Sequence, residues 1–245
     1  MIHNLTQRQI DILKSIVEEY INSASAVGSE TIEKKYNLSA SPATIRNEMV
    51  KLTELGFLEK PHASAGRIPT AIGMRLYVKE LMKTKQLSTV EEVALKEKVW
   101  DYRSQLERFL KEATKSLAQK TGTVAIATTD DGQIFCSGYA HILDMPEFFD
   151  IDVTKALLTA LDEYEYFMGL FQGEVDEEDE VHIVMGDELG GRLHGPYGLV
   201  YTQYHTPAHQ KGKIGVIGPL RLNYVAVVPT VRYFGNLIED IAQGW

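Results

Sequence analysis

Residues 41–70 carry small, polar and basic side chains in an order that is typical of a DNA-binding element, SPATIRNEMVKLTELGFLEKPHASAGRIPT. Ser41 can cap a helix with its hydroxyl, and Pro42 suits the first helical position, where a missing N–H costs nothing. Gly56 supplies a stop for that helix. At helical spacing, the face expected to be buried holds Ile45, Met49 and Leu52, and the opposite face holds Ala43, Asn47 and Val50.

The small and polar face of this helix is suited to the major groove of DNA, and its side chains differ in the contact we expect of them. Ala43 has a small side chain, in keeping with the small and polar character of this face. Arg46 and Asn47 are the candidates for base contact, because Arg pairs bidentately with guanine and Asn with adenine. Ser41 and Thr44 lie in the first turn, where side chains often contact phosphate.

A short strand and a hairpin punctuated by Pro and Gly follow the helix at once, in the order of a winged helix-turn-helix. We expect Arg67 at the tip of the wing, where it can enter the minor groove or hold a phosphate. Lys60 and His62 are weaker candidates, because both also suit a role in wing geometry alone. Ser64 on the wing and Lys51 on the helix, which suits phosphate or solvent equally, complete the predicted DNA-contacting set.

The residues around this motif supply the rest of a compact module. Thr6 and Gln9 form a capping-box pattern at the start of an amphipathic helix. We therefore predict a winged helix-turn-helix DNA-binding domain over residues 1–85. Its expected elements are helices over 7–22, 29–36 and 71–85 and a strand over 57–59.

Charge is distributed unevenly along the chain. The formal net charge of −9 argues by itself against DNA binding. Residues 1–85 nevertheless hold 12 Lys and Arg against 9 Asp and Glu, whereas residues 86–245 hold 13 against 25. The basic excess therefore coincides with the predicted DNA-binding domain, and the acidic remainder limits non-specific binding.

The composition of the chain also indicates the cellular compartment in which the protein is expected. No segment approaches the run of about 18 apolar residues that a membrane span needs, and the polar N-terminus resembles no signal peptide. The single cysteine, Cys136, cannot form an intramolecular disulfide and fits a reducing environment. We therefore expect a cytoplasmic protein without membrane contact.

Residues 86–120 are expected to form a helical connector of about thirty residues, with apolar side chains at heptad-like spacing. Ser88 and Glu91 give it a capping box. The apolar stripe suits a dimer seam and a helix packed on its own domain about equally well. The stripe consists of Leu95, Val99, Tyr102, Leu106, Phe109 and Ala113.

Residues 121–245 change in character and predict a mixed α/β domain, with helices packed on an antiparallel sheet. The acidic run 174–180 is expected to be a solvated linker. The overall fold class is therefore α+β. Strands are expected over 123–128, 133–139, 181–185, 198–205 and 213–217, and helices over 152–171 and 224–241.

Several segments resemble the HrcA family, the bacterial heat-inducible repressors of chaperone genes. The wing segment is long and specific, and the matching segments lie toward both ends of the chain. They are VGSETI (27–32), SPATIRNEM (41–49), GFLEKPHASAGRIPT (56–70), Gly73, Arg75, Tyr77, Val78, MPEFFD (145–150) and GVIGPLRLNY (215–224).

The chain also departs from the family pattern. Family members are typically longer, and they carry a GAF-like domain interrupted by an inserted dimerising domain. Here the strand TGTVAIAT (121–128) leads almost directly into CSGYAHILDMPEF (136–148). The resemblance therefore implies a truncated GAF-like domain over residues 121–245 that lacks the insert. Leu222 also replaces a usual Met.

The resemblance implies a function without catalysis, cofactor or metal. Family members repress heat-shock operons by binding an inverted-repeat operator as dimers, and the chaperonin maintains the active repressor. The implied partners are double-stranded DNA, a second copy of the chain and the chaperonin. Such control requires only a repressor of marginal stability, since a folding partner can then set its active fraction.

The sequence leaves two other functions to consider, a small-molecule sensor and a metal-dependent enzyme. The C-terminal domain suits a small-molecule sensor, as GAF-like folds often do, but the sequence shows no clear set of convergent polar groups. A metal-dependent enzyme is disfavoured, because the spacing of the histidines matches no tight ligand pattern and one cysteine cannot build the usual zinc site. The histidines concerned are His182, His194, His205 and His209.

Overall fold

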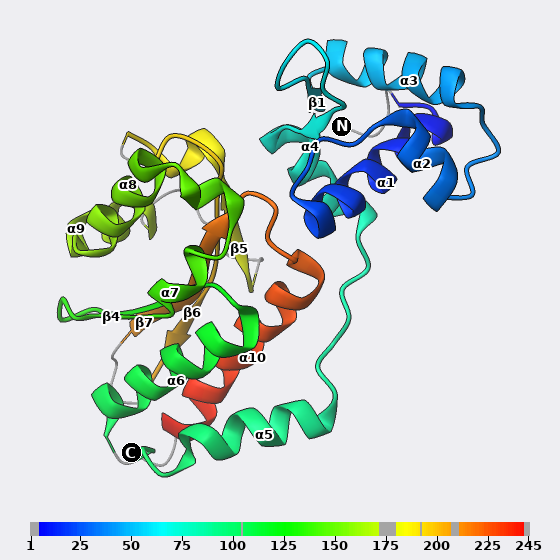
Figure 1. The fold of residues 1–245 in the computed structure, drawn as a ribbon. Coiled ribbons are helices and arrows are strands. Elements are labelled where there is room, and N and C mark those ends of the chain that lie inside the picture. Colours follow the sequence, from blue (N-terminus) through cyan, green and yellow to red (C-terminus); the bar gives the residue numbers. More distant parts are fainter. Residues whose placement is uncertain (1–4, 104, 172–179, 192, 207–210, 243–245) are drawn as a thin grey trace. The chain divides into compact units, whose positions relative to one another are not determined.

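The chain folds into two units in the computed structural model, Met1–Lys83 and Thr84–Trp245 (Figure 1). No helix of the described part of the chain is long and apolar enough to cross a membrane. The described residues are 5–103, 105–171, 180–191, 193–206 and 211–242.

The first unit begins with three helices, α1 (Gln7–Ser23), α2 (Ser29–Lys35) and α3 (Pro42–Glu54). The predicted capping box is present, since the Thr6 hydroxyl accepts from the Gln9 N–H and the Gln9 side chain accepts from the Thr6 N–H. The sequence therefore predicted the first two helices to within one residue at each end. Their shared core includes Ile12, Leu13, Ile16, Ile32, Ile45 and Leu52.

The wing is a two-stranded hairpin, in which β1 (Leu58–Glu59) pairs antiparallel with β2 (Ile68–Pro69). It leads into α4 (Ala71–Leu76) and a π-helical segment, η2 (Tyr77–Leu81). The helix expected to reach residue 85 thus ends at Leu81. Its last buried side chains are Tyr77 and Val78, whereas Leu81 and Met82 are half-buried and residues 83–86 are exposed.

The second unit begins with two helices, α5 (Thr89–Trp100) and α6 (Leu106–Thr121). The expectation of one continuous helix was therefore wrong. The chain turns back between them, because Lys120 at the end of α6 lies 2.6 Å from Glu91 at the start of α5. This reversal lets apolar side chains of both helices become buried within one unit, including Val99 and Phe109.

A five-stranded antiparallel sheet forms the centre of the second unit, in the order β4-β3-β7-β6-β5. The antiparallel sheet was predicted, and each strand lies within two residues of its expected position. The strands are β3 (Val124–Thr129), β4 (Ile134–Ser137), β5 (His182–Met185), β6 (Tyr197–His205) and β7 (Lys211–Pro219).

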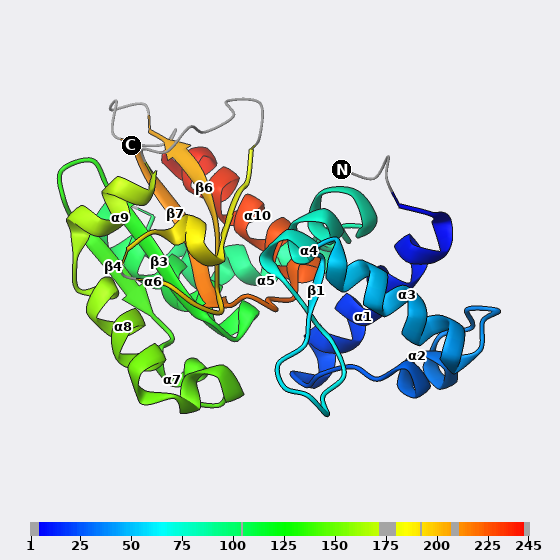
Figure 2. The ribbon, with the colours of Figure 1, turned by 90° about the horizontal axis from the view of Figure 1, so that it is seen from above.

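Helices cover both faces of this sheet (Figures 1 and 2). One face packs against α6 and α10 (Tyr224–Ala242). The other packs against α8 (Ile151–Leu161) and α9 (Tyr164–Phe171), in a cluster that contains alternate residues of the strands. The helix expected over 152–171 is thus two helices. Shorter helical turns are α7 (Tyr139–Ile142), η3 (Pro146–Phe149) and η4 (Gly186–Leu189).

A bidentate ion pair joins two distant segments of the second unit. Arg221 donates to Glu147 from Nε over 2.6 Å and from a terminal nitrogen over 3.0 Å. Both side chains are nearly buried, at 15% and 11% exposed. The pair therefore connects the MPEFFD and GPLRLNY segments, two of the segments that carry the family resemblance.

Removing one partner of this pair should be costly, because it leaves a charge buried without compensation. We expect Arg221→Leu to lower the free energy of unfolding by about 3–5 kcal/mol. Adding Glu147→Leu should recover much of that loss, as measured by urea unfolding. If the two substitutions simply add, the pair does not act as a coupled buried unit.

Candidate nucleic-acid interface

Helix α3 begins at the predicted residues, and the predicted face of the helix is exposed. Ser41 Oγ accepts from the Thr44 N–H over 3.2 Å, and the hydroxyls of the two residues lie 2.9 Å apart. Ile45, Met49 and Leu52 are buried, which fixes the opposite face toward solvent. The exposed residues of that face include Ala43, Arg46, Asn47 and Val50.

A nearly buried carboxylate holds α3 against α1. Glu48, 8% exposed, accepts from Gln9 Nε2 over 3.0 Å. Gln9 is the residue that also caps the start of α1, so one side chain fixes both helices. Lys51 Nζ lies 3.4 Å from the other oxygen of Glu48, and this ion pair orients the Lys51 side chain along α3.

The base of the wing is fixed by backbone pairing with the segment before α2. Arg67 N–H donates to Val27 O over 2.9 Å, and Val27 N–H donates to Arg67 O over 2.8 Å. Gly66 lies so close to this pair that an added Cβ would be 2.3 Å from Val27 O. The position therefore requires glycine.

Arg67 lies at this base and not at the wing tip, so its expected location was wrong. Its side chain is half-buried, and Nε donates to Thr53 Oγ1 over 2.9 Å, which connects the wing to the end of α3. The exposed loop around His62 forms the tip instead (Figure 2). There His62 Nδ1 lies 3.2 Å from Ser64 Oγ, and Lys60 Nζ donates to Ala63 O.

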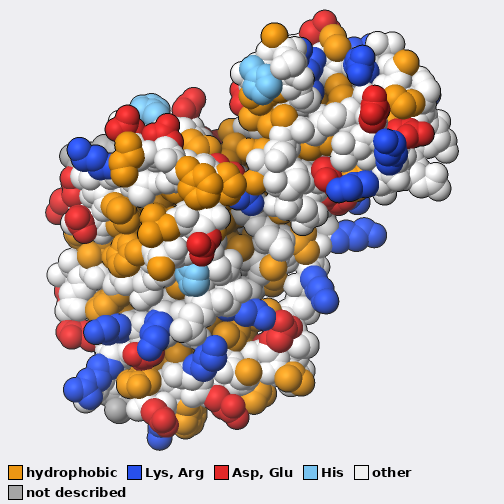
Figure 3. Space-filling view, viewed as in Figure 1, with side chains coloured by type: hydrophobic (Ala, Val, Ile, Leu, Met, Phe, Trp, Pro, Cys, Tyr) orange, Lys and Arg blue, Asp and Glu red, His pale blue; other side chains and the backbone are white. Residues whose placement is uncertain are grey.

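A groove of about 420 Å³ separates the exposed face of α3 from the wing. Three cations, Arg46, Lys60 and Arg67, line it, and none of its described lining residues is acidic. Lys and Arg side chains are visible over α3 in the space-filling view (Figure 3). The groove therefore suits a polyanion such as a phosphate backbone.

Sequence reasoning missed one wall of this groove. Val27, Gly28 and Ser29, at the start of α2, line it together with the wing. Nothing in their residue types indicates a contact with DNA, although they belong to the VGSETI segment that matched the family. Their place in the groove follows from the long-range pairing of Val27 with Arg67.

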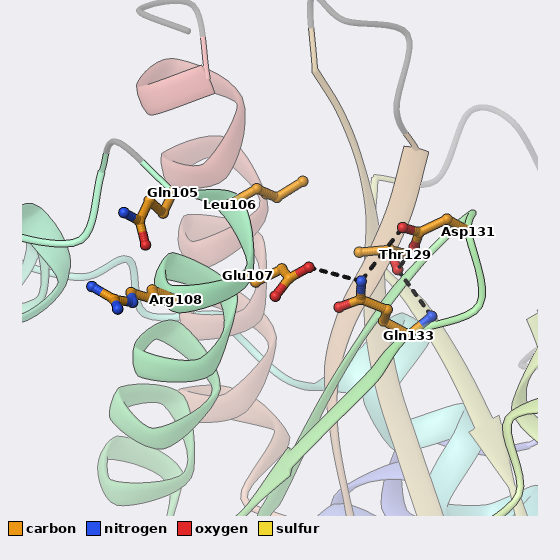
Figure 4. Close-up of a pocket in the computed structure, with 7 residues that line it drawn as sticks. All are labelled: Gln105, Leu106, Glu107, Arg108, Thr129, Asp131 and Gln133. Carbon is orange, nitrogen blue, oxygen red and sulfur yellow. Dashed lines mark hydrogen bonds between the residues drawn. The ribbon is translucent and has the colours of Figure 1, made fainter.

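The second unit contains a polar pocket of about 520 Å³ between the start of α6 and the β3–β4 hairpin (Figure 4). Gln133 Nε2 donates to Glu107 Oε1 over 2.9 Å, and Thr129 Oγ1 donates to Asp131. These polar groups thus bind one another, and Glu107, Arg108 and Asp131 are exposed. The pocket lacks the apolar, enclosing wall that is usual for small-molecule sites.

The histidines that the structure describes and Cys136 give no sign of metal or thiol chemistry. Within the described residues, no group of three His, Cys, Asp or Glu side chains could hold a metal ion. His194 and His205 each lie beside one exposed carboxylate, and His209 is outside the described residues, as is most of the acidic run 174–180. Burial raises the pKa of the Cys136 thiol to about 12, which keeps it protonated and unreactive.

Three helices, a wing and a basic groove define the first unit as a winged helix-turn-helix DNA-binding domain. Two family models support this assignment and extend it over most of the chain. A winged helix-turn-helix model of the HrcA DNA-binding domain matches residues 4–82, and the model of the HrcA C-terminal domain matches residues 70–228. The chain belongs to the HrcA family, whose members are transcription repressors and not enzymes.

Curated relatives give the same result. Heat-inducible transcription repressor HrcA of Thermomicrobium roseum is 26% identical, with 97% of this chain and 95% of that protein covered. The repressor of Ruminiclostridium cellulolyticum is 29% identical, with 96% and 97% covered. A crystal structure described as a hypothetical protein, 18% identical, has the same fold at a TM-score of 0.77, covering 98% of this chain and 99% of that chain.

The chain is shorter than these relatives. The alignment with the Thermomicrobium roseum repressor spans 332 positions, so the 245 residues of this chain leave at least 87 of them without a counterpart. Both proteins are covered almost completely. This agrees with the expectation that a segment present in longer family members is absent here.

The wing base provides a sharp test of the interface, because two glycines line the same groove with different surroundings. An added Cβ at Gly66 would collide with the Val27 backbone, whereas at Gly28 the nearest atom would be 3.9 Å away. We expect Gly66→Ala to displace the wing and weaken DNA binding at least tenfold in a fluorescence anisotropy titration. Gly28→Ala should bind like the unaltered protein, and equal affinity of both variants would show that wing position is irrelevant.

Proposed function

We propose that this protein represses heat-shock operons by binding an inverted-repeat operator as a dimer, with α3 in the major groove. The observation that carries the proposal is the basic groove between the exposed face of α3 and the wing. Membership of a family of heat-inducible repressors supplies the class of regulated gene. A dimer is expected because one module reads too few base pairs for specificity, and paired modules match an inverted repeat.

Arg46 and Asn47 are assigned to the bases. Both are exposed on α3, and Arg46 also lines the groove. Arg can pair with O6 and N7 of guanine, and Asn with N6 and N7 of adenine. Ala43 allows close approach, and the first turn with Ser41 and Thr44 is assigned to phosphate.

The remaining residues of the proposed interface are assigned to the phosphate backbone. Their contacts within the protein indicate how much each contributes to DNA binding. Lys60, His62 and Ser64 are exposed on the wing. Lys51 and Arg67 already have partners, Glu48 and Thr53, so contact with phosphate must replace or share these interactions. Lys60 also donates to Ala63 O, but that hydrogen bond is exposed, whereas the interactions of Lys51 and Arg67 are partly buried. We therefore assign a larger contribution to Lys60 than to Lys51 or Arg67.

The proposal also includes control of repressor activity by the chaperonin. A repressor of marginal stability has an active fraction that a folding partner can set. Heat diverts the chaperonin to unfolded proteins, so the active fraction falls and the operon is induced. In this proposal the second unit is a truncated GAF-like domain that contributes regulation and dimerisation.

The experiment that tests the proposal is a binding titration over a salt series, with an inverted-repeat duplex and a scrambled duplex. A preference of about a thousandfold for the repeat is expected of a specific repressor. The active fraction should rise when chaperonin is present during refolding. Equal and steeply salt-dependent binding to both duplexes would reduce the function to phosphate contact without sequence recognition.

Substitutions in α3 should separate base reading from phosphate contact. We expect Arg46→Ala and Asn47→Ala each to lose about 1–3 kcal/mol of discrimination between the two duplexes. Lys51→Ala should weaken binding to both and lower the salt slope by about one. Lys14→Ala, which removes a partly exposed cation of α1, serves as the control. A residue whose variant binds like this control has no role in recognition.

A further inference from the structure

Helix α3 carries an apolar side chain on its exposed face, Val50, which is 41% exposed. The core of the first unit does not use it, because the buried apolar residues of α3 are Ile45, Met49 and Leu52. A single exposed valine is common on protein surfaces and has no meaning by itself. The position of Val50 on the helix and the side chains around it distinguish it from such a residue.

Val50 lies in the middle of the exposed face of α3. Two helical turns take about seven residues, so Val50 lies only about 20° around the helix axis from Ala43. Arg46 and Asn47, the residues assigned to bases, lie on either side of this line. Glu54, one turn further along, is the first acidic residue of the exposed face. The part of the face that suits DNA therefore ends with Val50, which lies between the two proposed base readers.

Val50 also lines the basic groove between α3 and the wing, together with the cations Arg46, Lys60 and Arg67. In Figure 1 the wing lies beside the C-terminal half of α3. The centre of a protein–protein interface is usually depleted of charged residues, whereas Val50 lies among cations. A DNA duplex fits both features, because it offers phosphates to the cations and methyl groups in its major groove.

Leu55 shows that exposure alone does not produce this arrangement. It is 49% exposed, but it is the C-cap residue of α3 and is not among the described residues that line the groove. Helical spacing places it about 140° around the axis from Val50. Leu55 therefore provides a control on the same helix.

The branched side chain of Val50 is rigid, which suits a contact of fixed geometry. At an exposed helical position, valine gives a less stable helix than alanine would. The same branching leaves one strongly preferred rotamer, so both methyl groups are held in place before DNA binds and little side-chain entropy is lost. The matching apolar group in the major groove is the C5-methyl group of thymine.

We propose that Val50 determines specificity by contacting the C5-methyl group of one thymine in each half of the operator. Cytosine, adenine and guanine present no methyl group in the major groove, so the contact distinguishes thymine from each of them. The inference rests on the proposed function and deepens it. It adds an apolar contact to the hydrogen bonds that are assigned to Arg46 and Asn47.

The geometry of α3 also limits where this thymine lies. Val50 is four residues beyond Arg46, which is a rise of about 6 Å along the helix. Successive base pairs are about 3.4 Å apart, so the two side chains reach bases at most about two pairs apart. We therefore expect the thymine within about two base pairs of the guanine that Arg46 contacts.

Replacement of thymine by uracil tests the contact, because it removes this methyl group and leaves base pairing unchanged. The full chain is titrated by fluorescence anisotropy with inverted-repeat duplexes in which one symmetry-related pair of thymines at a time is replaced. We expect replacement of one pair to weaken binding about four- to fifteenfold. Loss of one buried methyl group costs roughly fourfold, and the repeat holds two of them.

Val50→Ala provides the second half of the test. Its affinity for the unmodified repeat should fall to that of the unaltered protein for the uracil duplex, and the same uracil replacement should then change its affinity less than about twofold. The variant should fold, because alanine is the better helix former at an exposed position. Urea unfolding checks this directly.

Two control variants should keep the full dependence on the thymine methyl group. Val90→Ala shortens a valine of α5 that is 79% exposed, and it matches the chemical change. Leu55→Ala removes an exposed apolar side chain at the end of α3 itself. Both should bind the unmodified repeat like the unaltered protein and should lose affinity for the uracil duplex to the same extent.

Two results would overturn the inference while operator recognition stands. One is a repeat in which no uracil replacement weakens binding of the unaltered protein. The other is an equal loss on uracil replacement in Val50→Ala and in the unaltered protein, which would assign the methyl contact to another residue. A protein that binds the repeat no better than a scrambled duplex would refute the proposed function, and with it the reading of thymine by Val50.

Discussion

The backbone pair between Val27 and Arg67 is the constraint on which the DNA-binding face depends. It brings together the start of α2 and the base of the wing, which lie forty residues apart, and Gly66 permits that approach. Arg67 adds a side-chain bond to Thr53 at the end of α3. The distance between recognition helix and wing, and with it the basic groove, is therefore set by a few polar contacts around one glycine.

Local features of the sequence were enough to predict the recognition helix. Ser41, Pro42 and the apolar spacing of Ile45, Met49 and Leu52 act within one helix, so its start and its buried face followed directly. The location of Arg67 could not be predicted, because it depends on pairing with Val27. The DNA contacts of the ten candidate residues remain predictions.

In the second unit, too, features that depend on long-range contacts could not be predicted from the sequence. Heptad-like spacing predicted a helical connector over residues 86–120 but not the reversal after Trp100, because both a straight helix and a folded pair satisfy that spacing. The ion pair of Glu147 with Arg221 spans 74 residues and has no local signal. It joins the MPEFFD and GPLRLNY segments, both of which carry the family resemblance.

The proposed function requires that α3 reads bases in the major groove of an inverted repeat. Methylation protection of guanine N7 on that duplex tests it most directly, because N7 lies in the major groove. We expect protection in both half-sites, about one helical turn apart, and loss of protection at one guanine per half-site with Arg46→Ala. Unprotected guanines in a saturated complex, or protection unchanged by Arg46→Ala, would contradict it.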